Sequence, residues 1–447
     1  MSNKCDENHE IIDVEALVSS KFEKELSGNL VMSSLCSIFR VPTILSRHNT
    51  AAFTPNAFSF GPFHHNSKQL KPTKKIKQKY LLDLVSRLSK PNPNVDPNLL
   101  KNFTKAINEI QNKARQYYAG PVDDMKEEEF LEMLVLDGCF IIELFRKKSY
   151  THLRGTDDPI FTMPCLLQFL YHDLILLENQ MPWLVLETLF ELTKTRTTAT
   201  PSIDENMPLV ALVIDFFGNI FSNESIPRKP LLCADPDPEY KHILDLLRKS
   251  LILNSSTIEK QKSHQWEPMH PATDLWNSGI KFQVNTRSPS LLDITFCSKT
   301  GVMLIPELLI QETTETVFRN LISLEQCCPN YEPIFTSYAF LLDNLINGNA
   351  DIQILCKSKA IINWLNIDDA TKLFNRLYID TFVKEYYYYP LTNEVNNYRR
   401  RHWPRYRRVL TRDYFKHPWA LISVIAASIA LILTFLQTVF AIIGKDK

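Results

Sequence analysis

The chain has 447 residues, 45% of them apolar, and its 50 basic and 50 acidic side chains give a formal net charge of zero. These values exclude an intrinsically disordered protein, a strongly basic nucleic-acid-binding protein and a small disulfide-stabilised domain. Only 10 residues are glycine, so few backbone positions can wrap around a phosphate group. The nine cysteines form neither a disulfide framework nor a Cys-x-x-Cys metal site, and we expect no metal and no cofactor.

Residues 1–30 are polar and contain no recognisable secretory signal peptide. Residues 31–398 are predicted to form one large, irregular, mainly α domain. Near its start, the segment Ser59–His65 ends in two adjacent histidines, His64 and His65. Neighbouring side chains on an extended backbone point in opposite directions, which favours a structural or hydrogen-bonding role over a shared metal site. Lysines recur from Lys68 to Lys79 and predict a solvated helix face, with membrane-surface contact as the alternative.

Hydrophobic periodicity predicts several helices in the domain. Apolar residues recur at three- and four-residue steps from Glu127 to Lys148, with acidic residues in the first turn and basic residues in the last. A second apolar stretch spans Met163–Phe190, where Pro182 predicts a break near Asn179–Met181. Shorter helices are predicted at Glu239–Leu253, Thr314–Leu324, Ser337–Leu345 and Asp368–Thr381.

Several polar side chains lie inside or directly after these apolar runs. A buried carboxylate is costly unless it is hydrogen-bonded or paired, so these residues predict an internal polar network, with an acid/base pair as the alternative. The candidates are His64, His65, Asp137, Glu143, Asp173, Glu178, Asn179 and Gln180.

Strand signals are concentrated between Gly279 and Ile310. Three short runs, IKFQVN, LLDITFC and VMLIPELLI, are separated by turn residues and predict a small β-meander packed on the helices. Loops are predicted at Pro91–Pro97, Thr193–Pro208, Asp235–Pro238 and Ser255–His270.

Residues 418–443 are predicted to form one transmembrane helix. The segment from Pro418 to Gly444 contains no charged residue. About 25 helical residues extend roughly 37 Å, enough to cross the ~30 Å hydrocarbon core of a lipid bilayer. The predicted membrane anchor residues are Trp419, Leu421, Ile425, Ile429, Leu433, Leu436 and Phe440.

The charges beside this helix predict its orientation. Residues 399–417 form a basic juxtamembrane segment, whereas only the short tail 444–447 follows the helix. Since cytoplasmic flanks collect Lys and Arg, we expect a cytoplasmic body, a tail on the opposite side, and contact between the basic cluster and anionic headgroups. That cluster is Arg399, Arg400, Arg401, Arg405, Arg407, Arg408, Arg412 and Lys416. Glycosylation at Asn102, Asn223 or Asn254 would instead indicate the reverse topology, that of a receptor-like extracellular module.

The common catalytic signatures are missing from the sequence. It contains no GxGxxG, GxxxxGK[ST], GxSxG or HExxH motif, and no set of protein-kinase loops. We therefore expect a protein that is not an enzyme, although residues of a catalytic site need not be adjacent in sequence.

Ordered sequence blocks along nearly the whole chain resemble the plant family known as domain of unknown function 247. They are IFRVP (38–42), FTP (53–55), SFGPFHH (59–65), LDGCFIIEL (136–144), DLILLENQMP (173–182), HILDLLR (242–248), ATDLWNSGIKF (272–282), FRNLISLEQ (318–326) and YFKHPW (414–419). Members usually carry Met-Glu after the paired histidines, where this chain has Thr73-Lys74. The resemblance implies a membrane-attached plant protein without an assigned catalytic activity. Some relatives are connected with recognition between pollen and stigma in grasses, which implies an interaction module.

The leading functional hypothesis is a single-pass membrane-anchored recognition or scaffold protein that contacts an unidentified protein partner. No nucleic-acid partner and no small-molecule cofactor are expected. The alternative is a membrane-associated hydrolase or transferase that uses the buried carboxylates with His64 and His65.

Overall fold

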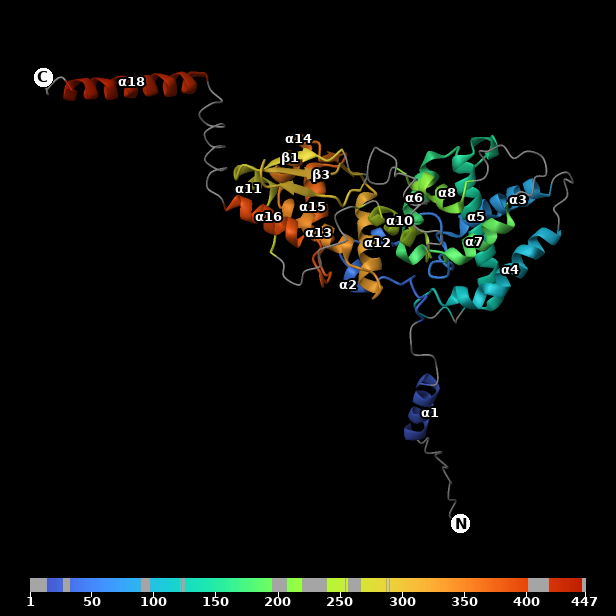
Figure 1. Ribbon diagram of the computed structural model, residues 1–447. Helices are drawn as coiled ribbons and strands as arrows, with labels where there is room; N and C mark the ends of the chain where they lie inside the picture. Colours follow the sequence, from blue (N-terminus) through green and yellow to red (C-terminus); the bar gives the residue numbers. More distant parts are fainter. Residues whose placement is uncertain are drawn as a thin grey trace, which may run out of the picture.

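The computed structural model describes residues 14–26, 33–89, 97–120, 122, 125–194, 207–218, 239–253, 255, 267–286, 288, 290–400 and 418–443. These residues form a mainly α fold with short strands, which confirms the predicted fold class (Figure 1). The predicted loops Pro91–Pro97, Thr193–Pro208, Asp235–Pro238 and Ser255–His270 lie largely outside the described residues.

Helix α5 (Glu127–Ser149) is the centre of the first helical group and confirms the helix predicted from Glu127. Its residues from Met133 to Lys147 are all buried. Around it pack α3 (Lys74–Leu88), α4 (Pro97–Arg115), α7 (Trp183–Leu192) and α8 (Leu209–Phe217). Gly138 permits the close approach of α7, because a Cβ atom there would lie 2.5 Å from Leu189 Cδ1.

The second predicted apolar stretch is interrupted where Pro182 predicted a break. It forms α6 (Pro164–Asp173), the 3₁₀ turn η4 (Leu177–Asn179) and α7, with Pro182 at the N-cap of α7. Because Pro has no N–H and a fixed φ, it is tolerated at a helix start but not inside the helix. Helix α6 ends before this break, at Asp173, and the Asp173 carboxylate accepts hydrogen bonds from a distant part of the main chain.

The four remaining predicted helices are present with small shifts at their ends. They are α10 (Ile243–Leu253), α12 (Thr314–Cys327), α13 (Ile334–Leu345) and α15 (Ile367–Leu377). Further helical elements are α1 (Val14–Leu26), α2 (Thr43–Ser46), α11 (Ala272–Asn277), α14 (Asn349–Lys357), α16 (Tyr389–Arg399), η1 (Thr50–Phe53), η2 (Lys71–Thr73) and η3 (Thr151–Leu153).

The small β element is present, but the predicted meander is wrong. Strands β1 (Lys281–Val284), β2 (Thr295–Cys297) and β3 (Val302–Ile305) have the order β1-β3-β2, with β1 parallel and β2 antiparallel to β3. The more buried β3 thus forms ladder hydrogen bonds on both edges, which satisfies its backbone polar groups. Pro306 separates β3 from β4 (Leu308–Ile310), which pairs in parallel with β5 (Ile361–Asn363) in a second sheet.

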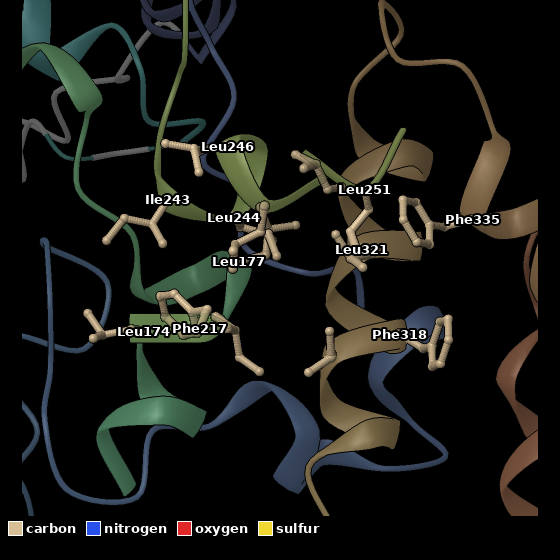
Figure 2. Close-up of a cluster of buried hydrophobic side chains, with 14 of the residues drawn as sticks. Leu174, Leu177, Phe217, Ile243, Leu244, Leu246, Leu251, Phe318, Leu321 and Phe335 are labelled. Atoms are coloured by element: carbon tan, nitrogen blue, oxygen red, sulfur yellow. The ribbon is translucent and has the colours of Figure 1, made fainter. Parts of the chain in front are cut away.

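Helix α10 connects the two halves of the hydrophobic core. In Figure 2, Ile243 and Leu244 of α10 lie near Leu174 and Phe217, whereas Leu251 faces the side occupied by Leu321 and Phe335. All the labelled side chains are buried. The N-terminal helical group and the later α12–α13 group therefore share one continuous core.

Helix α18 (Pro418–Ile443) is long and apolar enough to cross a membrane. Its window Ile422–Val439 has a mean hydropathy of 2.2 and no buried residue. Trp419, Ile425, Ile429, Leu433 and Leu436 are exposed. The side chains of Leu421 and Phe440 lie outside the described residues.

Candidate functional site

Asp173 is completely buried and binds the backbone of a segment far away in sequence. Its carboxylate accepts hydrogen bonds from the N–H groups of Asn56 (2.7 Å), Ala57 (2.9 Å) and Phe58 (2.8 Å). Three N–H donors satisfy most of the acceptor capacity of a carboxylate. Asp173 therefore holds the segment after η1 against the end of α6.

Asn179 and Gln180 continue this contact as amide side chains that pair with the main chain. Asn179 accepts from the Phe60 N–H (2.7 Å) and donates to the carbonyls of Phe58 and Asp173 (both 2.9 Å). Gln180 donates to the carbonyls of Leu174 and Leu176 and accepts from the N–H of Leu244 in α10 (3.1 Å). These side chains supply hydrogen-bond partners to buried main-chain groups that have no partner in a helix or a sheet.

Asp137 forms a buried ion pair with Lys77 of α3. The Nζ atom of Lys77 lies 2.6 Å from Asp137 Oδ1, and the two side chains are 6% and 2% exposed. Lys77 also donates to the Ser59 carbonyl, and the other Asp137 oxygen accepts from the Gly61 N–H (3.2 Å). Gly61 has φ +70° and leaves no room for a Cβ atom, which would lie 2.7 Å from the Gln180 carbonyl oxygen.

The two predicted histidines lie in different surroundings. His64 Nε2 is 3.2 Å from Glu178 Oε2, but its direction does not satisfy the geometry of a hydrogen bond. The other Glu178 oxygen accepts from the Val41 N–H (2.8 Å). His65 Nε2 lies 3.7 Å from Glu129. The two imidazoles therefore face different carboxylates.

Glu143 belongs to a separate ion pair. Its Oε2 atom lies 2.6 Å from Arg87 Nη2, and the Glu143 side chain is buried. Next to it, burial lowers the pKa of Arg146 to about 10, with a further contribution from the positive charge of Arg87. The structure thus places Glu143 apart from the contacts made by Asp173 and Asn179.

Asp137, Asp173, Glu178 and Asn179 together form what we term the polar cluster. Its shared feature is hydrogen bonding to main-chain groups between Val41 and Gly61. Tyr118, whose pKa is raised by burial and by the nearby Asp137, donates to the Gln180 carbonyl (3.1 Å) at the same junction. Chemically, this arrangement fixes a long irregular segment to α5 and α6.

Sequence reasoning missed several members of these networks. Lys77 was grouped with solvated lysines, yet it shares the buried face of α3 with Tyr80 and Leu84. Its spacing of three and seven residues from them was the available signal. Asn320 of α12 accepts from the Leu177 N–H (2.8 Å) and donates to the Ala52 carbonyl (2.7 Å). Its spacing of three residues from Val317 and four from Leu324 was the corresponding signal.

The predicted basic cluster is only partly described. Arg400 forms an exposed ion pair with Glu267 (3.0 Å), and Arg399 ends α16. The other members, Arg401, Arg405, Arg407, Arg408, Arg412 and Lys416, lie outside the described residues. Of the three glycosylation sequons, Asn102 is exposed on α4, while Asn223 and Asn254 lie outside the described residues.

Comparison with known proteins identifies the family. The family model DUF247, a plant protein of unknown function, matches residues 38–433. UPF0481 protein At3g47200 of Arabidopsis thaliana is 28% identical over 440 residues, which cover 92% of this chain and 88% of that protein. A second relative from the same plant, named "Putative UPF0481 protein At3g02645", is 20% identical over 519 residues, which cover 97% of this chain and 95% of that protein. No solved structure matches at a significant level. The resemblance noted in the sequence is thereby confirmed, and the chain belongs to the DUF247 family of plant proteins of unknown function.

Proposed function

We propose that the chain is a single-pass membrane-anchored protein whose body acts as a recognition or scaffold module by contact with a protein partner. The observation that carries the anchor is the apolar surface of α18, which has no buried residue in the window Ile422–Val439. Exposing apolar surface to water costs about 25 cal/mol per Å². Insertion into hydrocarbon removes this cost while the helix satisfies its own backbone.

The proposed orientation places the body in the cytoplasm and the tail on the other side. The juxtamembrane segment 399–417 is rich in arginine, whereas the tail 444–447 carries only two lysines and one aspartate. Such an asymmetry favours retention of the basic flank on the cytoplasmic side.

The proposal of a recognition module is supported by how the buried carboxylates are used. Asp173 accepts three main-chain N–H bonds, and Asp137 is shared between Lys77 and Gly61. A general base needs a free lone pair directed at the substrate. Groups whose lone pairs are already occupied by the backbone are better suited to stabilising the fold that presents a binding surface.

The alternative, a membrane-associated hydrolase or transferase, rests on the pair of His64 and Glu178. Both side chains are partly exposed, at 18% and 14%, and lie 3.2 Å apart. It predicts that His64→Gln and Glu178→Gln abolish a hydrolytic or transfer activity without altering stability or partner binding. The recognition proposal predicts that neither substitution changes a hydrolytic or transfer activity of the chain.

The anchor is tested by alkaline carbonate extraction of membranes from cells that produce the full chain. We expect the chain in the membrane pellet and a chain ending at residue 417 in the supernatant. Ile425→Lys with Ile429→Lys should release the full chain, because each lysine at a helix centre costs about 3 kcal/mol on insertion. The matched control, Ile425→Leu with Ile429→Leu, should stay in the pellet. Extraction of the unsubstituted full chain would overturn the anchor.

The orientation is tested by protease protection of sealed microsomes with a tag at either end. We expect the N-terminal tag to be digested and the C-terminal tag to be protected. The reverse pattern, together with an endoglycosidase-sensitive shift that Asn102→Gln removes, would show the opposite topology.

The recognition role is tested by proximity labelling in intact cells with a biotin ligase fused to residue 1. The matched control carries the same ligase on residues 399–447 alone. We expect a partner that the full chain labels and the control does not, and that binds the purified full chain directly. Identical labelling by both fusions would contradict a partner-binding body.

A further inference from the structure

The three-stranded sheet β1-β3-β2 has an inner face that packs on the rest of the body. Phe282 of β1 and Met303 of β3 are buried on this face, and Phe296 of β2 packs edge to face against Tyr398 of α16, with ring centroids 5.3 Å apart. Successive side chains of a strand point to opposite faces of the sheet. The residues on either side of these three therefore form the outer face of the sheet.

The outer face is polar and basic and contains no carboxylate. The strand register arranges its residues in two rows, Lys281 with Val302 and Cys297, and Gln283 with Leu304 and Thr295. Lys281, Gln283 and Cys297 are exposed, and the other three are half-buried. A negatively charged surface can therefore approach this face without meeting a like charge.

A second lysine lies at one end of the outer face. Lys299 is exposed in the turn between β2 and β3, and the Lys281 N–H donates to the Gly301 carbonyl in the same turn (2.8 Å). Hydrogen bonds from Thr300 and from the Lys299 N–H lower the pKa of the Cys297 thiol, and the nearby Lys299 charge lowers it further. Within the described part of the chain, neither lysine forms an ion pair, so both charges are available to a partner.

The chain leaves the body beside this face. Helix α16 ends at Arg399, and its Tyr398 ring lies so close to Gly301 that no Cβ atom would fit there. In Figure 1, α16 and the strands β1 and β3 occupy the same end of the body. Residues 401–417 connect this end to α18, and at about 3.5 Å per residue they reach no further than about 60 Å.

Two acidic side chains at the end of α16 are balanced by two arginines. Glu267 forms an ion pair with Arg400 (3.0 Å). Burial lowers the pKa of His270, on which the charges of Arg399 and Arg400 act in one direction and those of Asp274 and Glu267 in the other. These four charges sum to zero, so they neither add to nor cancel the charge of the two lysines on the sheet.

We propose that the outer face of the β1-β3-β2 sheet docks on the anionic surface of the membrane that holds α18. Lys281 and Lys299 contact the negatively charged lipid headgroups, and Gln283 and Thr295 face the hydrated headgroup layer. The tether favours a lipid surface over a soluble acidic protein, because it keeps this face at a high effective concentration of headgroups. The inference rests on the proposed anchor and extends it, since it assigns the face of the body that lies against the membrane.

The exposed thiol of Cys297 lies on the outer face and can report the docking. The full chain is placed in nanodiscs of phosphatidylcholine, without or with about 30% phosphatidylserine as the anionic lipid. Alkylation by iodoacetamide, an uncharged reagent, is followed for each cysteine by mass spectrometry of its peptide, with the exposed Cys165 of α6 as the internal reference. We expect phosphatidylserine to slow alkylation of Cys297 at least about threefold and to leave Cys165 unchanged. Salt at about 0.5 M should remove the difference by screening the charges.

A pair of variants tests whether the two lysines are responsible. Each lysine near an anionic surface strengthens the attraction about fivefold, so the pair accounts for about thirtyfold. Lys281→Gln with Lys299→Gln should therefore bring the ratio of Cys297 rates in the two lipids to about one. Using this ratio within each variant removes the direct effect of Lys299 on the thiol. The matched control, Lys101→Gln with Lys105→Gln, replaces two exposed lysines of α4 and should keep the ratio of the unsubstituted chain.

Three results would overturn the proposal. They are equal Cys297 rates in the two lipids, an unchanged ratio in the folded Lys281→Gln, Lys299→Gln variant, and slowing by soluble polyglutamate but not by anionic nanodiscs, which would assign the face to an acidic protein. Folding of each variant is checked by its urea unfolding midpoint. Incorporation into nanodiscs is measured separately and reports the anchor. Loss of docking with normal incorporation leaves the anchor unaffected, whereas loss of incorporation overturns both.

Discussion

Lys77 and Asp137 form an ion pair of 2.6 Å between α3 and α5 in which both side chains are almost completely buried. Removing two charges from water costs several kcal/mol per ion, which only excellent geometry and additional hydrogen bonds can offset. Here Lys77 also bonds the Ser59 carbonyl, and Asp137 also bonds the Gly61 N–H. The pair therefore fixes the Ser59–His65 segment to both helices.

Removing one partner of this pair should destabilise the protein strongly. We expect Lys77→Met to lower the free energy of unfolding by about 3–5 kcal/mol, because Asp137 is left as an unpaired buried charge. The double variant Lys77→Met with Asp137→Leu should recover part of the loss. Urea unfolding of the chain in non-ionic detergent measures both, with the exposed Lys75→Met as the control. A Lys77→Met variant as stable as the control would show that the pair is unimportant.

Substitution of Gly61 should disturb the same segment through the backbone. Its φ of +70° is unfavourable for other residues, and a Cβ atom would lie 2.7 Å from the Gln180 carbonyl oxygen. We expect Gly61→Ala to cost about 2–4 kcal/mol and to increase amide hydrogen exchange at residues 56–61. Gly120→Ala is informative as a comparison, because its φ is also positive but no atom lies within 4 Å of the added Cβ. Gly120→Ala should lower the free energy of unfolding only by the cost of backbone strain. Equal losses of free energy in the two variants would contradict the steric contribution at Gly61.

His242 should make folding stability sensitive to mild acid. Burial lowers its pKa to about 4, against 6.5 in the unfolded chain, despite the nearby Asp245. The unfolded state therefore binds the proton first, so the contribution of His242 is complete above pH 6.5 and is lost as the pH falls toward 4. A difference of this size corresponds to about 3 kcal/mol.

The variant His242→Phe removes this titration. Its unfolding free energy should fall less between pH 7 and pH 4.5 than that of the unsubstituted chain, even though it is less stable at pH 7. The exposed His152→Gln should keep the original pH dependence. A parallel pH dependence in His242→Phe would show that His242 is not the titrating group.

Asp343 of α13 should make folding stability depend on pH with the opposite sign to that expected for His242. Burial raises the pKa of this carboxyl from 3.8 to about 6, so its ionisation opposes folding. The penalty is absent below pH 3.8 and is complete once the pH has risen through 6. After allowance for its partial exposure, we expect Asp343→Asn to stabilise the protein by about 1 kcal/mol at pH 7.5 and to have no effect near pH 4. Thermal unfolding at the two pH values measures this, and a gain of equal size at both would rule out the ionisation effect.

The outcome of each sequence prediction depended on the range of the interactions involved. The helix from Glu127 and the break at Pro182 were predictable, because hydrophobic periodicity and the missing proline N–H act within a few residues. The β-meander was wrong, because β1 pairs with β3 and not with β2, the next strand in the sequence, and spacing within the strands does not determine this choice. Lys77 was missed for a different reason, because its membership of a lysine-rich run hid the local spacing that places it on the buried face of α3.

Local chemistry in the sequence by itself determined the mainly α class, the apolar helix near the C-terminus and the family to which the chain belongs. These properties depend on composition, on spacing within single elements and on ordered sequence blocks. Only the tertiary structure decided that Asp173 and Asn179 bind the backbone between Asn56 and Phe60, and that Ser37, Lys241 and Ile334 share one cleft. The hydrogen bonds of Asp173 and Asn179 join residues more than 100 positions apart, and the lining of the cleft comes from three separate segments, so spacing within a single element could not predict either.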